Sequence, residues 1–362
     1  MKILILKPSS LGDVVQALPV ARLLKQHYPS SSIFWWLDRR FVPLLDADPD
    51  LAGIIPFERN RWSNPRYWLE AWQSLREIRA HQFDLVIDLQ SLLRSGVVAW
   101  LANGGCTAGL DDPREGARAF YDIAVPRANY HFHAVDWYLS VLTVLGVPVH
   151  WNFQWLPPRK PVAATIREKW PMGDARWIAL QPGARWQNKR WPLEHFIQVV
   201  QQLSEAEADL RFVILGSAAD APLGQAIREA AGAHCLDLTG TTSLPEMVEW
   251  IRAAHLLITN DTGPMHVAAA LRKPLIALFG PTERRRTGPY GQLDHVLQAS
   301  APCVPCMKPV CHYRQPLACL RGTQPAEVVR LALAELSRTP RAFANTPVRA
   351  AFTPTDPANF RT

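Results

Sequence analysis

The sequence lacks the long apolar runs that mark membrane spans, because no stretch of its 362 residues reaches the apolar length needed to cross a bilayer. At the N-terminus, Lys2 is followed by only four apolar residues before Lys7 and Pro8. That run is too short for the hydrophobic region of a signal peptide. We therefore expect a cytoplasmic protein.

Several ligand-binding motifs are also missing. The sequence contains no GxGxxG, no GxxxxGK[ST] and no GxSxG, which removes the usual arguments for a dinucleotide oxidoreductase, a P-loop ATPase and an α/β hydrolase. The net charge of +7 and the pI near 9.2 imply an acidic partner, either a phosphorylated substrate, an anionic membrane surface or nucleic acid. Without a zinc-finger, RNP or helix-turn-helix signature, nucleic acid is the weakest of these, and we expect no nucleic-acid partner.

Length and a hydrophobic content of 48% predict two domains. Short apolar runs alternate with helical segments in two series, which predicts an α/β protein with two doubly wound parallel sheets. The expected strands are 2–6, 32–37, 53–56 and 85–89 in the first series, and 177–181, 211–216, 256–259 and 275–279 in the second. The proline-rich stretch 148–161 reads as the linker. The predicted domains are 1–155 and 156–337, followed by a poorly ordered tail at 338–362.

The first expected strand runs directly into a polar turn and then a helix predicted over 14–26. Ser9, Ser10 and Gly12 suit a tight turn at the carboxyl end of a buried strand, where open α/β sheets bind ligands. Asp13 follows at the start of the helix. Two interpretations stay open for Asp13, a helix-capping carboxylate and a catalytic group.

Basic and aromatic residues alternate between 59 and 79. Trp68, Trp72 and Ile78 fall at helical spacing, which predicts a helix that buries a tryptophan stripe and exposes its arginines. Arg59 and Arg61 precede this helix in a loop, where a guanidinium is able to bind phosphate or carboxylate. A basic amphipathic stretch of this kind can also rest against anionic lipid.

The loops after the second series of strands are polar as well. Between 260 and 266 a helix is expected to begin, with Asp261 and Thr262 as caps and Gly263 leaving the backbone open to a phosphate or a ribose hydroxyl. His266 lies one turn in and is either a ligand contact or a packed core residue. Lys189, just before another helix, could supply a point charge to a diphosphate.

Together these motifs resemble those of glycosyltransferase family 9, the ADP-heptose:lipopolysaccharide heptosyltransferases. The matching stretches are Lys-Pro-Ser-Ser-Leu-Gly-Asp-Val at 7–14, His-Ala-Val-Asp at 133–136, Lys-Arg-Trp-Pro at 189–192, Asn-Asp-Thr-Gly-Pro-Met-His at 260–266 and Phe-Gly-Pro-Thr at 279–282. The first is most similar to the motif of heptosyltransferases I. The resemblance implies a GT-B fold, with two Rossmann-like domains facing across a cleft, the first binding the acceptor and the second the nucleotide sugar.

The resemblance also implies roles for individual residues. Asp13 matches the general base, while the nucleotide-sugar set comprises Ser9, Ser10, Gly12, Lys189, Asp220, Asp261, Thr262, Gly263 and His266. Asp220 stands where relatives carry a glutamate that contacts sugar hydroxyls. The basic positions that meet an acidic acceptor are Arg59, Arg61, Arg94 and Arg114.

The implied reaction is inverting transfer of heptose from ADP-L-glycero-D-manno-heptose to Kdo or heptose of the lipopolysaccharide inner core on lipid A, without a catalytic cofactor. The enzyme would act peripherally at the cytoplasmic face of the inner membrane. Two alternatives stay open, which are transfer of a heptose or another sugar to a protein or another glycan, and a non-catalytic GT-B shell that binds a glycan or nucleotide.

Four of the six cysteines form a C-x2-C-x4-C-x7-C cluster. These are Cys303, Cys306, Cys311 and Cys319. Disulfides are rare in cytoplasmic proteins, so the cluster is interpreted either as a structural zinc or iron site or as four reduced thiols. A site closed by four thiolates has no open coordination position, so its metal would be structural.

Overall fold

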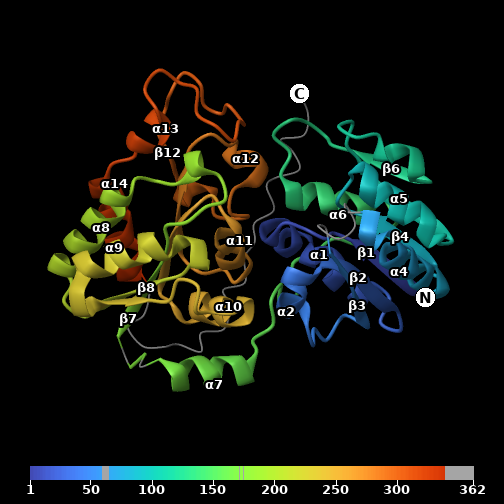
Figure 1. Ribbon diagram of the computed structural model, residues 1–362, viewed down its shortest axis with the longest axis horizontal. Helices are drawn as coiled ribbons and strands as arrows, with labels where there is room; N and C mark the ends of the chain where they lie inside the picture. Colours follow the sequence, from blue (N-terminus) through green and yellow to red (C-terminus); the bar gives the residue numbers. More distant parts are fainter. Residues whose placement is uncertain (59–64, 171, 174, 339–362) are drawn as a thin grey trace. The chain divides into compact units, whose positions relative to one another are not determined.

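The computed structural model describes residues 1–58, 65–170, 172–173 and 175–338 (Figure 1). The chain divides into two compact units, with the boundary between Pro157 and Pro158. We call them unit 1 and unit 2 and describe each by itself. Within the described ranges, no helix combines the length and apolar character that a bilayer span requires.

Unit 1 contains a parallel six-stranded sheet with the order β3-β2-β1-β4-β5-β6. Ile5 at the centre of the sheet pairs with Trp35 on one side and Ile87 on the other. The central strands are apolar throughout because both faces of the sheet are covered. The strands are β1 (Lys2–Leu6), β2 (Ser32–Asp38), β3 (Gly53–Phe57), β4 (Leu85–Asp88), β5 (Cys106–Asp111) and β6 (Ile123–Pro126).

Helices cover the two faces of this sheet in two sets. The helices are α1 (Leu11–His27), α2 (Val42–Leu45), α4 (Trp68–Ala80), α5 (Leu93–Ala102) and α6 (Ala134–Val144). α1 packs against α6 and α4 packs against α5. Because the crossovers through α1 and through α4 and α5 run in opposite directions along the sheet, right-handed connections place them on opposite faces. A core cluster under α4 and α5 includes Leu4, Leu6, Val86, Ile78 and Val98.

The prediction of a buried tryptophan stripe on α4 is wrong. Ile78 is fully buried, but Trp68 is 63% exposed and Trp72 is 52% exposed. At ~100° per residue, Trp72 lies about 120° around the helix from Ile78. Only a narrow strip of α4 faces the sheet. The spacing of the tryptophans predicted the helix correctly, but their side chains lie on the outer side of α4.

Unit 2 repeats the architecture with the strand order β12-β11-β10-β7-β8-β9, again all parallel. The strands are β7 (Arg176–Gln181), β8 (Leu210–Ile214), β9 (Cys235–Asp237), β10 (Leu256–Asn260), β11 (Leu275–Phe279) and β12 (Val296–Gln298). The helices are α7 (Lys160–Lys169), α8 (Leu193–Ala206), α9 (Ala221–Ala231), α10 (Leu244–Ala253), α11 (Gly263–Ala270), α12 (Arg284–Thr287), α13 (Ala318–Arg321) and α14 (Pro325–Arg338).

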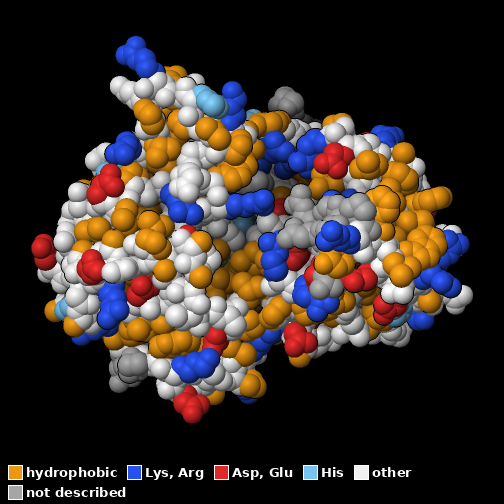
Figure 2. All heavy atoms as spheres, in the orientation of Figure 1, with side chains coloured by type: hydrophobic (Ala, Val, Ile, Leu, Met, Phe, Trp, Pro, Cys, Tyr) orange, Lys and Arg blue, Asp and Glu red, His pale blue; other side chains and the backbone are white. Residues whose placement is uncertain are grey.

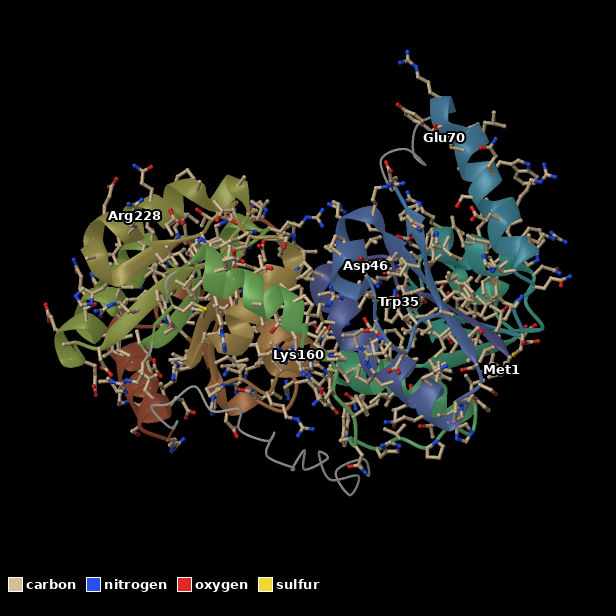
Figure 3. The ribbon with its side chains drawn as sticks, turned by 90° about the horizontal axis from the view of Figure 1, so that it is seen from below. Met1, Trp35, Asp46, Glu70, Lys160 and Arg228 are labelled. Carbon is tan, nitrogen blue, oxygen red and sulfur yellow. The ribbon has the colours of Figure 1, made fainter. Side chains whose placement is uncertain are left out.

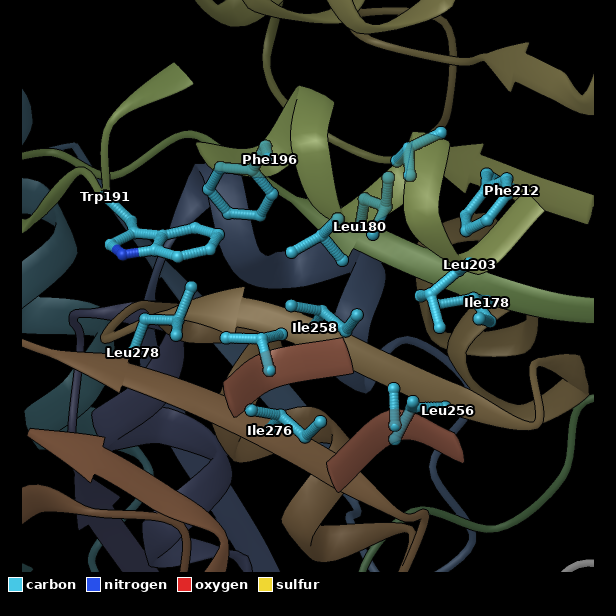
Figure 4. Close-up of a cluster of buried hydrophobic side chains, with 14 of the residues drawn as sticks. Ile178, Leu180, Trp191, Phe196, Leu203, Phe212, Leu256, Ile258, Ile276 and Leu278 are labelled. Atoms are coloured by element: carbon cyan, nitrogen blue, oxygen red, sulfur yellow. The ribbon is translucent and has the colours of Figure 1, made fainter. Parts of the chain in front are cut away.

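The core of unit 2 lies between its sheet and the helices α8 and α14. Figure 4 shows Phe196 of α8 near Leu180 of β7, and Leu203 of α8 beside Ile178 of the same strand. Full burial of a large apolar side chain contributes about 2 kcal/mol, so this cluster stabilises the strand ends that carry the polar loops. Trp191 closes the cluster at the end next to those loops.

The predicted α/β class with two doubly wound sheets is confirmed, and all eight expected strands are present. Four strands toward the sheet edges were not predicted, namely β5, β6, β9 and β12. Helix α1 begins at Leu11, three residues before the predicted start, and Arg338 is helical although the prediction placed it in the tail. Residues 339–362, the rest of that predicted tail, lie outside the described residues.

Candidate active site

Each sheet has a topological switch point, where neighbouring strands continue toward opposite edges and a crevice opens at their carboxyl ends. In unit 1 the switch lies between β1 and β4, and the following loops are joined by Lys7 Nζ, which donates to the Leu89 carbonyl at 2.9 Å. In unit 2 it lies between β7 and β10, where Asn260 Nδ2 donates to the Pro182 carbonyl at 2.7 Å. The predicted loops therefore form a polar loop cluster in each unit.

Asp13 caps helix α1 with one of its carboxylate oxygens. Its Oδ2 accepts hydrogen bonds from the Ser10 backbone N–H at 2.8 Å and from the Ser10 hydroxyl at 2.6 Å. Its Oδ1 lies 3.5 Å from the Tyr138 hydroxyl and 4.0 Å from Lys7 Nζ. The side chain is nevertheless 40% exposed. Capping and catalysis are therefore compatible in this geometry, because they use different parts of the carboxylate.

Lys7 is buried directly behind Asp13. Its Nζ lies 4.8 Å from the centre of the Tyr138 ring, and the residue is only 4% exposed. Burial works against the charged ammonium, but Tyr138, Asp13 and Asp88 outweigh it and raise the pKa of Lys7. Burial also raises the pKa of Tyr138, so this phenol stays neutral. The sequence interpretation did not predict that Lys7 and Tyr138 lie beside Asp13. Tyr138 is 125 residues away from Asp13 in the sequence.

The loop that carries Ser9 and Ser10 is held by the neighbouring strand β2. The Lys7 carbonyl accepts a hydrogen bond from Trp35 Nε1 at 3.0 Å, and the Pro8 carbonyl accepts one from the Asp38 backbone N–H at 3.1 Å. Gly12 is buried in the first turn of α1. These residues surround Asp13 in unit 1, and their predicted role in nucleotide-sugar binding stays a prediction.

Of the four predicted acceptor-binding arginines, Arg94 and Arg114 are described, whereas Arg59 and Arg61 lie outside the described residues. Arg114 Nε donates to both carboxylate oxygens of Asp112 at 2.9 Å. Although burial opposes it, this contact lowers the pKa of Asp112. The charge of Asp13 also acts on Arg114 and helps to raise its pKa, although the bond to Asp112 is the main cause. Arg94, at the start of α5, lies 5.7 Å from the Phe57 ring centre.

The polar loop cluster of unit 2 contains an ion pair between Lys189 and Asp261. Lys189 Nζ lies 2.6 Å from Asp261 Oδ2, and the Thr282 hydroxyl donates to the same oxygen at 2.5 Å. The side chains of Lys189 and Asp261 are 18% and 5% exposed. Three loops, after β10, after β11 and before α8, thus meet at one carboxylate. The contact to Thr282 was not predicted, although its place after the strand next to β10 could have indicated it.

The predicted N-cap position of Thr262 on α11 is confirmed, but the predicted capping by Asp261 is wrong. Thr262 occupies the N-cap position without a side-chain hydrogen bond to the helix, and the Asp261 carboxylate binds Lys189 and Thr282. The nearby cation attracts Asp261 more strongly than neutral backbone N–H groups do. His266 is buried in α11, one turn from Gly263. Whether these residues contact a ligand stays a prediction.

Asp220 lies at the end of a short 3-10 turn, Ala218–Asp220. Its Oδ2 accepts hydrogen bonds from the Ser217 backbone N–H at 3.0 Å and from the Ser217 hydroxyl at 2.7 Å. Arg190 lies 3.5 Å from Oδ1. A Cβ atom on Gly183 would come within 2.4 Å of this carboxylate, so the turn after β7 requires glycine there.

The four clustered cysteines lie in a loop that packs on the polar loop cluster of unit 2. Asn188 Nδ2 donates to the Lys308 carbonyl at 2.8 Å, and the Met307 N–H donates to the Pro281 carbonyl at 2.8 Å. Burial raises the pKa of Cys319, and the other three thiols add to this shift. Even so, among the described residues no three His, Cys, Asp or Glu side chains are arranged to hold a metal ion.

Comparison with known proteins identifies the family. The family model described as glycosyltransferase family 9 (heptosyltransferase) matches residues 71–316. The chain is 31% identical over 331 residues to lipopolysaccharide heptosyltransferase 1 of Pseudomonas aeruginosa, covering 87% of this chain and 88% of that relative. It is 30% identical to lipooligosaccharide heptosyltransferase 2 of Haemophilus influenzae, covering 82% of this chain and 88% of that relative.

Solved structures agree with this match. The structure of ADP-heptose lipopolysaccharide heptosyltransferase II of Escherichia coli has a TM-score of 0.75 and 25% sequence identity, covering 93% of this chain and 99% of the other. A heptosyltransferase WaaC of E. coli with ADP has a TM-score of 0.74 at 23% identity, covering 92% of this chain and 100% of the other, and shares the fold. The fold is thus GT-B, and the chain is a glycosyltransferase that belongs to family 9.

Proposed function

We propose that this glycosyltransferase moves heptose from ADP-L-glycero-D-manno-heptose, with inversion, to Kdo or heptose of the lipopolysaccharide inner core on lipid A. The observation that carries the proposal is the geometry of Asp13. Its carboxylate is fixed by Ser10 at the switch point of unit 1 and is still 40% exposed. The relatives named lipopolysaccharide heptosyltransferase 1 and lipooligosaccharide heptosyltransferase 2 support the substrate class.

In the proposed reaction Asp13 is the general base. The acceptor hydroxyl oxygen forms a bond to the anomeric carbon, its proton passes to the Asp13 carboxylate, and the bond from that carbon to ADP breaks. Attack opposite the leaving group inverts the anomeric configuration. A positioned base of this kind contributes about two to four powers of ten in rate.

The residues of unit 2 are assigned to the donor. Lys189 supplies a cation to the diphosphate, and the N-terminal N–H groups of α11 add partial positive charge, so that the departing ADP is stabilised without a catalytic metal. Asp261 holds Lys189 in place, and Thr282 donates a hydrogen bond to the same oxygen of Asp261. Thr262, Gly263, His266 and Asp220 are assigned to the ribose and the sugar. We accordingly assign 156–337 to the donor and 1–155 to the acceptor.

The acceptor is assigned to the arginines of unit 1. Kdo sugars and lipid A phosphates are acidic, and guanidinium groups bind carboxylate and phosphate in a bidentate manner. Arg114 follows β5 and Asp13 follows β1, so both come after the carboxyl ends of strands in one parallel sheet. Arg59, Arg61 and Arg94 complete the proposed set. An acceptor embedded in the inner membrane would place the enzyme peripherally at its cytoplasmic face.

The experiment is an incubation of the purified protein with ADP-heptose and Kdo-bearing lipid A. Transfer of heptose with inverted anomeric configuration, read by mass spectrometry and NMR, is the expected result. A parallel acceptor that already carries one heptose distinguishes the two heptosyltransferase subtypes. Hydrolysis of ADP-heptose without transfer would point to another acceptor, such as a protein or another glycan. Binding of ADP-heptose without any turnover would indicate a non-catalytic shell.

We further propose that Cys303, Cys306, Cys311 and Cys319 close on one structural zinc or iron ion. Their thiols have the donor chemistry that these metals prefer, and all four fall between residues 303 and 319 of one loop. Coordination requires the sulfurs to move closer together than they stand in this structure. Such a metal would stiffen the loop over Asn188 and Pro281 and take no part in the transfer itself.

A further inference from the structure

The outer face of α4 exposes unusually large apolar side chains. Trp68 is 63% exposed, Leu69 is 69% exposed and Trp72 is 52% exposed. Single exposed apolar residues are common, but neighbouring large ones mark a surface that contacts a partner or a membrane. The proposed function leaves these three residues without a role.

Charged residues of α4 are divided between two sides of the helix. At ~100° per residue, Arg76 and Arg79 lie on the same side as the two tryptophans and Leu69. Both arginines are exposed, and neither forms an ion pair with another residue in the part of the chain that the structure describes. Glu70 and Glu77 lie on the flank, where they line a hollow of about 310 Å³ beside β3. The exposed apolar face of α4 is therefore basic, and its acidic residues point elsewhere.

Helix α5 extends this surface, because it packs beside α4 on the same face of the sheet. Leu93 is 50% exposed and Trp100 is 62% exposed, and Arg94 next to Leu93 is exposed as well. Figure 2 shows hydrophobic side chains gathered with Lys and Arg over α4 and α5. In Figure 3 the end of α4 that carries Glu70 extends beyond the strands of unit 1. We call Trp68, Leu69, Trp72, Arg76 and Arg79, with Leu93 and Trp100, the α4–α5 surface.

We propose that the α4–α5 surface docks on an anionic lipid bilayer, with the tryptophans and leucines in the headgroup region and the arginines on the lipid phosphates. Tryptophan is enriched at membrane interfaces because its ring is apolar and its N–H is polar. Arginine keeps its charge in the polar layer while its stem covers apolar surface. The 13 residues of α4 extend only about 20 Å, so the helix lies along the interface.

Charge favours lipid over a second copy of the chain as the occupant. A symmetric dimer through this surface would bring Arg76 and Arg79 of both copies into one interface, where like charges repel. An anionic headgroup layer instead complements them. The proposed function supplies only the purpose of this membrane contact, which is to bring unit 1 to a lipid-linked acceptor. The contact itself is a property of the surface and can be measured without any substrate.

The experiment is co-sedimentation of the full chain with vesicles of phosphatidylglycerol and phosphatidylethanolamine, compared with vesicles of phosphatidylcholine alone. Three double variants are compared with the wild type, namely Trp68→Ser/Trp72→Ser, Arg76→Gln/Arg79→Gln and the matched control Arg167→Gln/Arg228→Gln on exposed helices of unit 2. Tyr130→Ser, at another exposed ring of unit 1, is the aromatic control. Thermal unfolding verifies that each variant is folded. Transfer to a delipidated, soluble acceptor is measured in parallel.

The wild type and both controls should bind the anionic vesicles and bind phosphatidylcholine much more weakly. The tryptophan variant should lose binding about tenfold or more, since it removes the inserted apolar groups. The arginine variant should lose about fivefold per arginine and most of the salt dependence. Transfer to the soluble acceptor should be unchanged in both variants, so a failure of the proposed function would be seen separately.

Three results would overturn the proposal. The first is wild-type protein that stays in the supernatant with anionic vesicles. The second is equal loss of binding in the control variants, which would show that total charge alone is responsible. The third is a concentration-dependent dimer, detected by light scattering, that the tryptophan variant abolishes, because the occupant would then be a second copy. If the tryptophan variant does not fold, the arginine pair alone decides between these outcomes.

Discussion

Both units carry a Ser-x-x-Asp turn beside the carboxyl end of the sheet, but the two aspartates have different surroundings. Asp13 and Asp220 each accept two hydrogen bonds from the serine three positions earlier, with distances between 2.6 and 3.0 Å. The side chain of Asp13 is 40% exposed, whereas that of Asp220 is 9% exposed and faces Arg190. Identical local chemistry therefore produces an accessible carboxylate in unit 1 and an enclosed one in unit 2.

The comparison shows that a helix cap does not reveal whether a carboxylate can react. The cap uses one oxygen in both units, so reactivity depends on what surrounds the other oxygen. For Asp13 those surroundings are Lys7, Tyr138 and solvent, and for Asp220 they are Arg190 and the backbone at Gly183. Only the first arrangement leaves room for an acceptor hydroxyl. The predictions that follow test this difference.

The largest effect is expected for Asp13→Asn. The amide keeps a hydrogen-bond acceptor for the Ser10 cap but cannot take a proton, so kcat should fall roughly a hundredfold or more while ADP-heptose binding stays nearly unchanged. Steady-state kinetics and calorimetry measure the two quantities. Asp220→Asn is the matched control. It should keep kcat within about threefold and change mainly the KM for ADP-heptose. Near-normal turnover of Asp13→Asn would reduce Asp13 to a cap.

The second effect concerns Asp261, the enclosed carboxylate of unit 2 that forms an ion pair with Lys189. Lys189→Met leaves Asp261 buried with Thr282 as its remaining partner, and it should lower the free energy of unfolding by about 3 kcal/mol. Adding Asp261→Asn should restore much of that loss, since the uncompensated charge is gone. Urea unfolding measures stability, and both variants should bind ADP more weakly. Full stability of the single variant would show that the ion pair is not enclosed in solution.

A smaller effect is expected from the four arginines that are assigned to the acceptor. Replacing Arg94 and Arg114 by Ala, with Arg59 and Arg61 in a second variant, should raise the acceptor KM about tenfold and weaken its salt dependence. The KM for ADP-heptose should change little, because that substrate is assigned to unit 2. An equal rise in both KM values would indicate general damage to the fold.

Unit 1 contains a single cysteine, Cys106, whereas unit 2 contains the loop with four clustered cysteines. This loop tests whether the fold of unit 2 needs a structural metal. Protein purified without chelator should contain about one zinc or iron per chain, and Cys303→Ser/Cys306→Ser should lose it together with several degrees of thermal stability. Catalysis by the remaining folded protein should persist. Cys235→Ser is the control. Metal-free wild-type protein would contradict the proposed structural metal. A Cys303→Ser/Cys306→Ser variant that keeps full stability but loses turnover would place the loop in the active site.

The smallest effect concerns His255 in unit 2, which is 5% exposed and whose Nδ1 accepts a hydrogen bond from the Trp177 N–H at 3.2 Å. Burial, aided by Lys273 and Arg176, lowers the pKa of His255 below its usual value of 6.5. The unfolded chain therefore binds this proton at a higher pH than the folded one. Stability should be complete above about pH 6.5 and fall as the pH drops through the folded pKa.

Urea unfolding at pH 7.5 and at pH 5.5 measures this dependence. The loss of stability between the two pH values should be smaller in His255→Gln than in the wild type. His27→Gln, at an exposed position, is the control and should retain the full loss. An unchanged pH dependence in His255→Gln would show that other groups cause it.

The sequence by itself determined the fold class and the central strands. Continuous apolar runs such as 3–6 and 256–258 are recognisable because both faces of those strands are buried. It also determined the local turns, since the bond between Ser10 and Asp13 spans only three residues. The short strands β9 and β12, with three residues each, left no such pattern. Neither did β5, where Gly109 is required by the approach of Tyr121 from elsewhere in the chain.

Only the tertiary structure decided which polar residues meet and which apolar ones stay outside. Asp261 is joined to Lys189 across 72 residues and to Thr282 across 21, and Tyr138 reaches Asp13 from a different helix. Such contacts depend on the order of the strands in the sheet, and the residues that meet carry no local sequence pattern that reveals this order. The tryptophans of α4 follow the same principle. Helical spacing predicts that they share a side of the helix, but the width of the strip that α4 buries against the sheet decides that they are exposed.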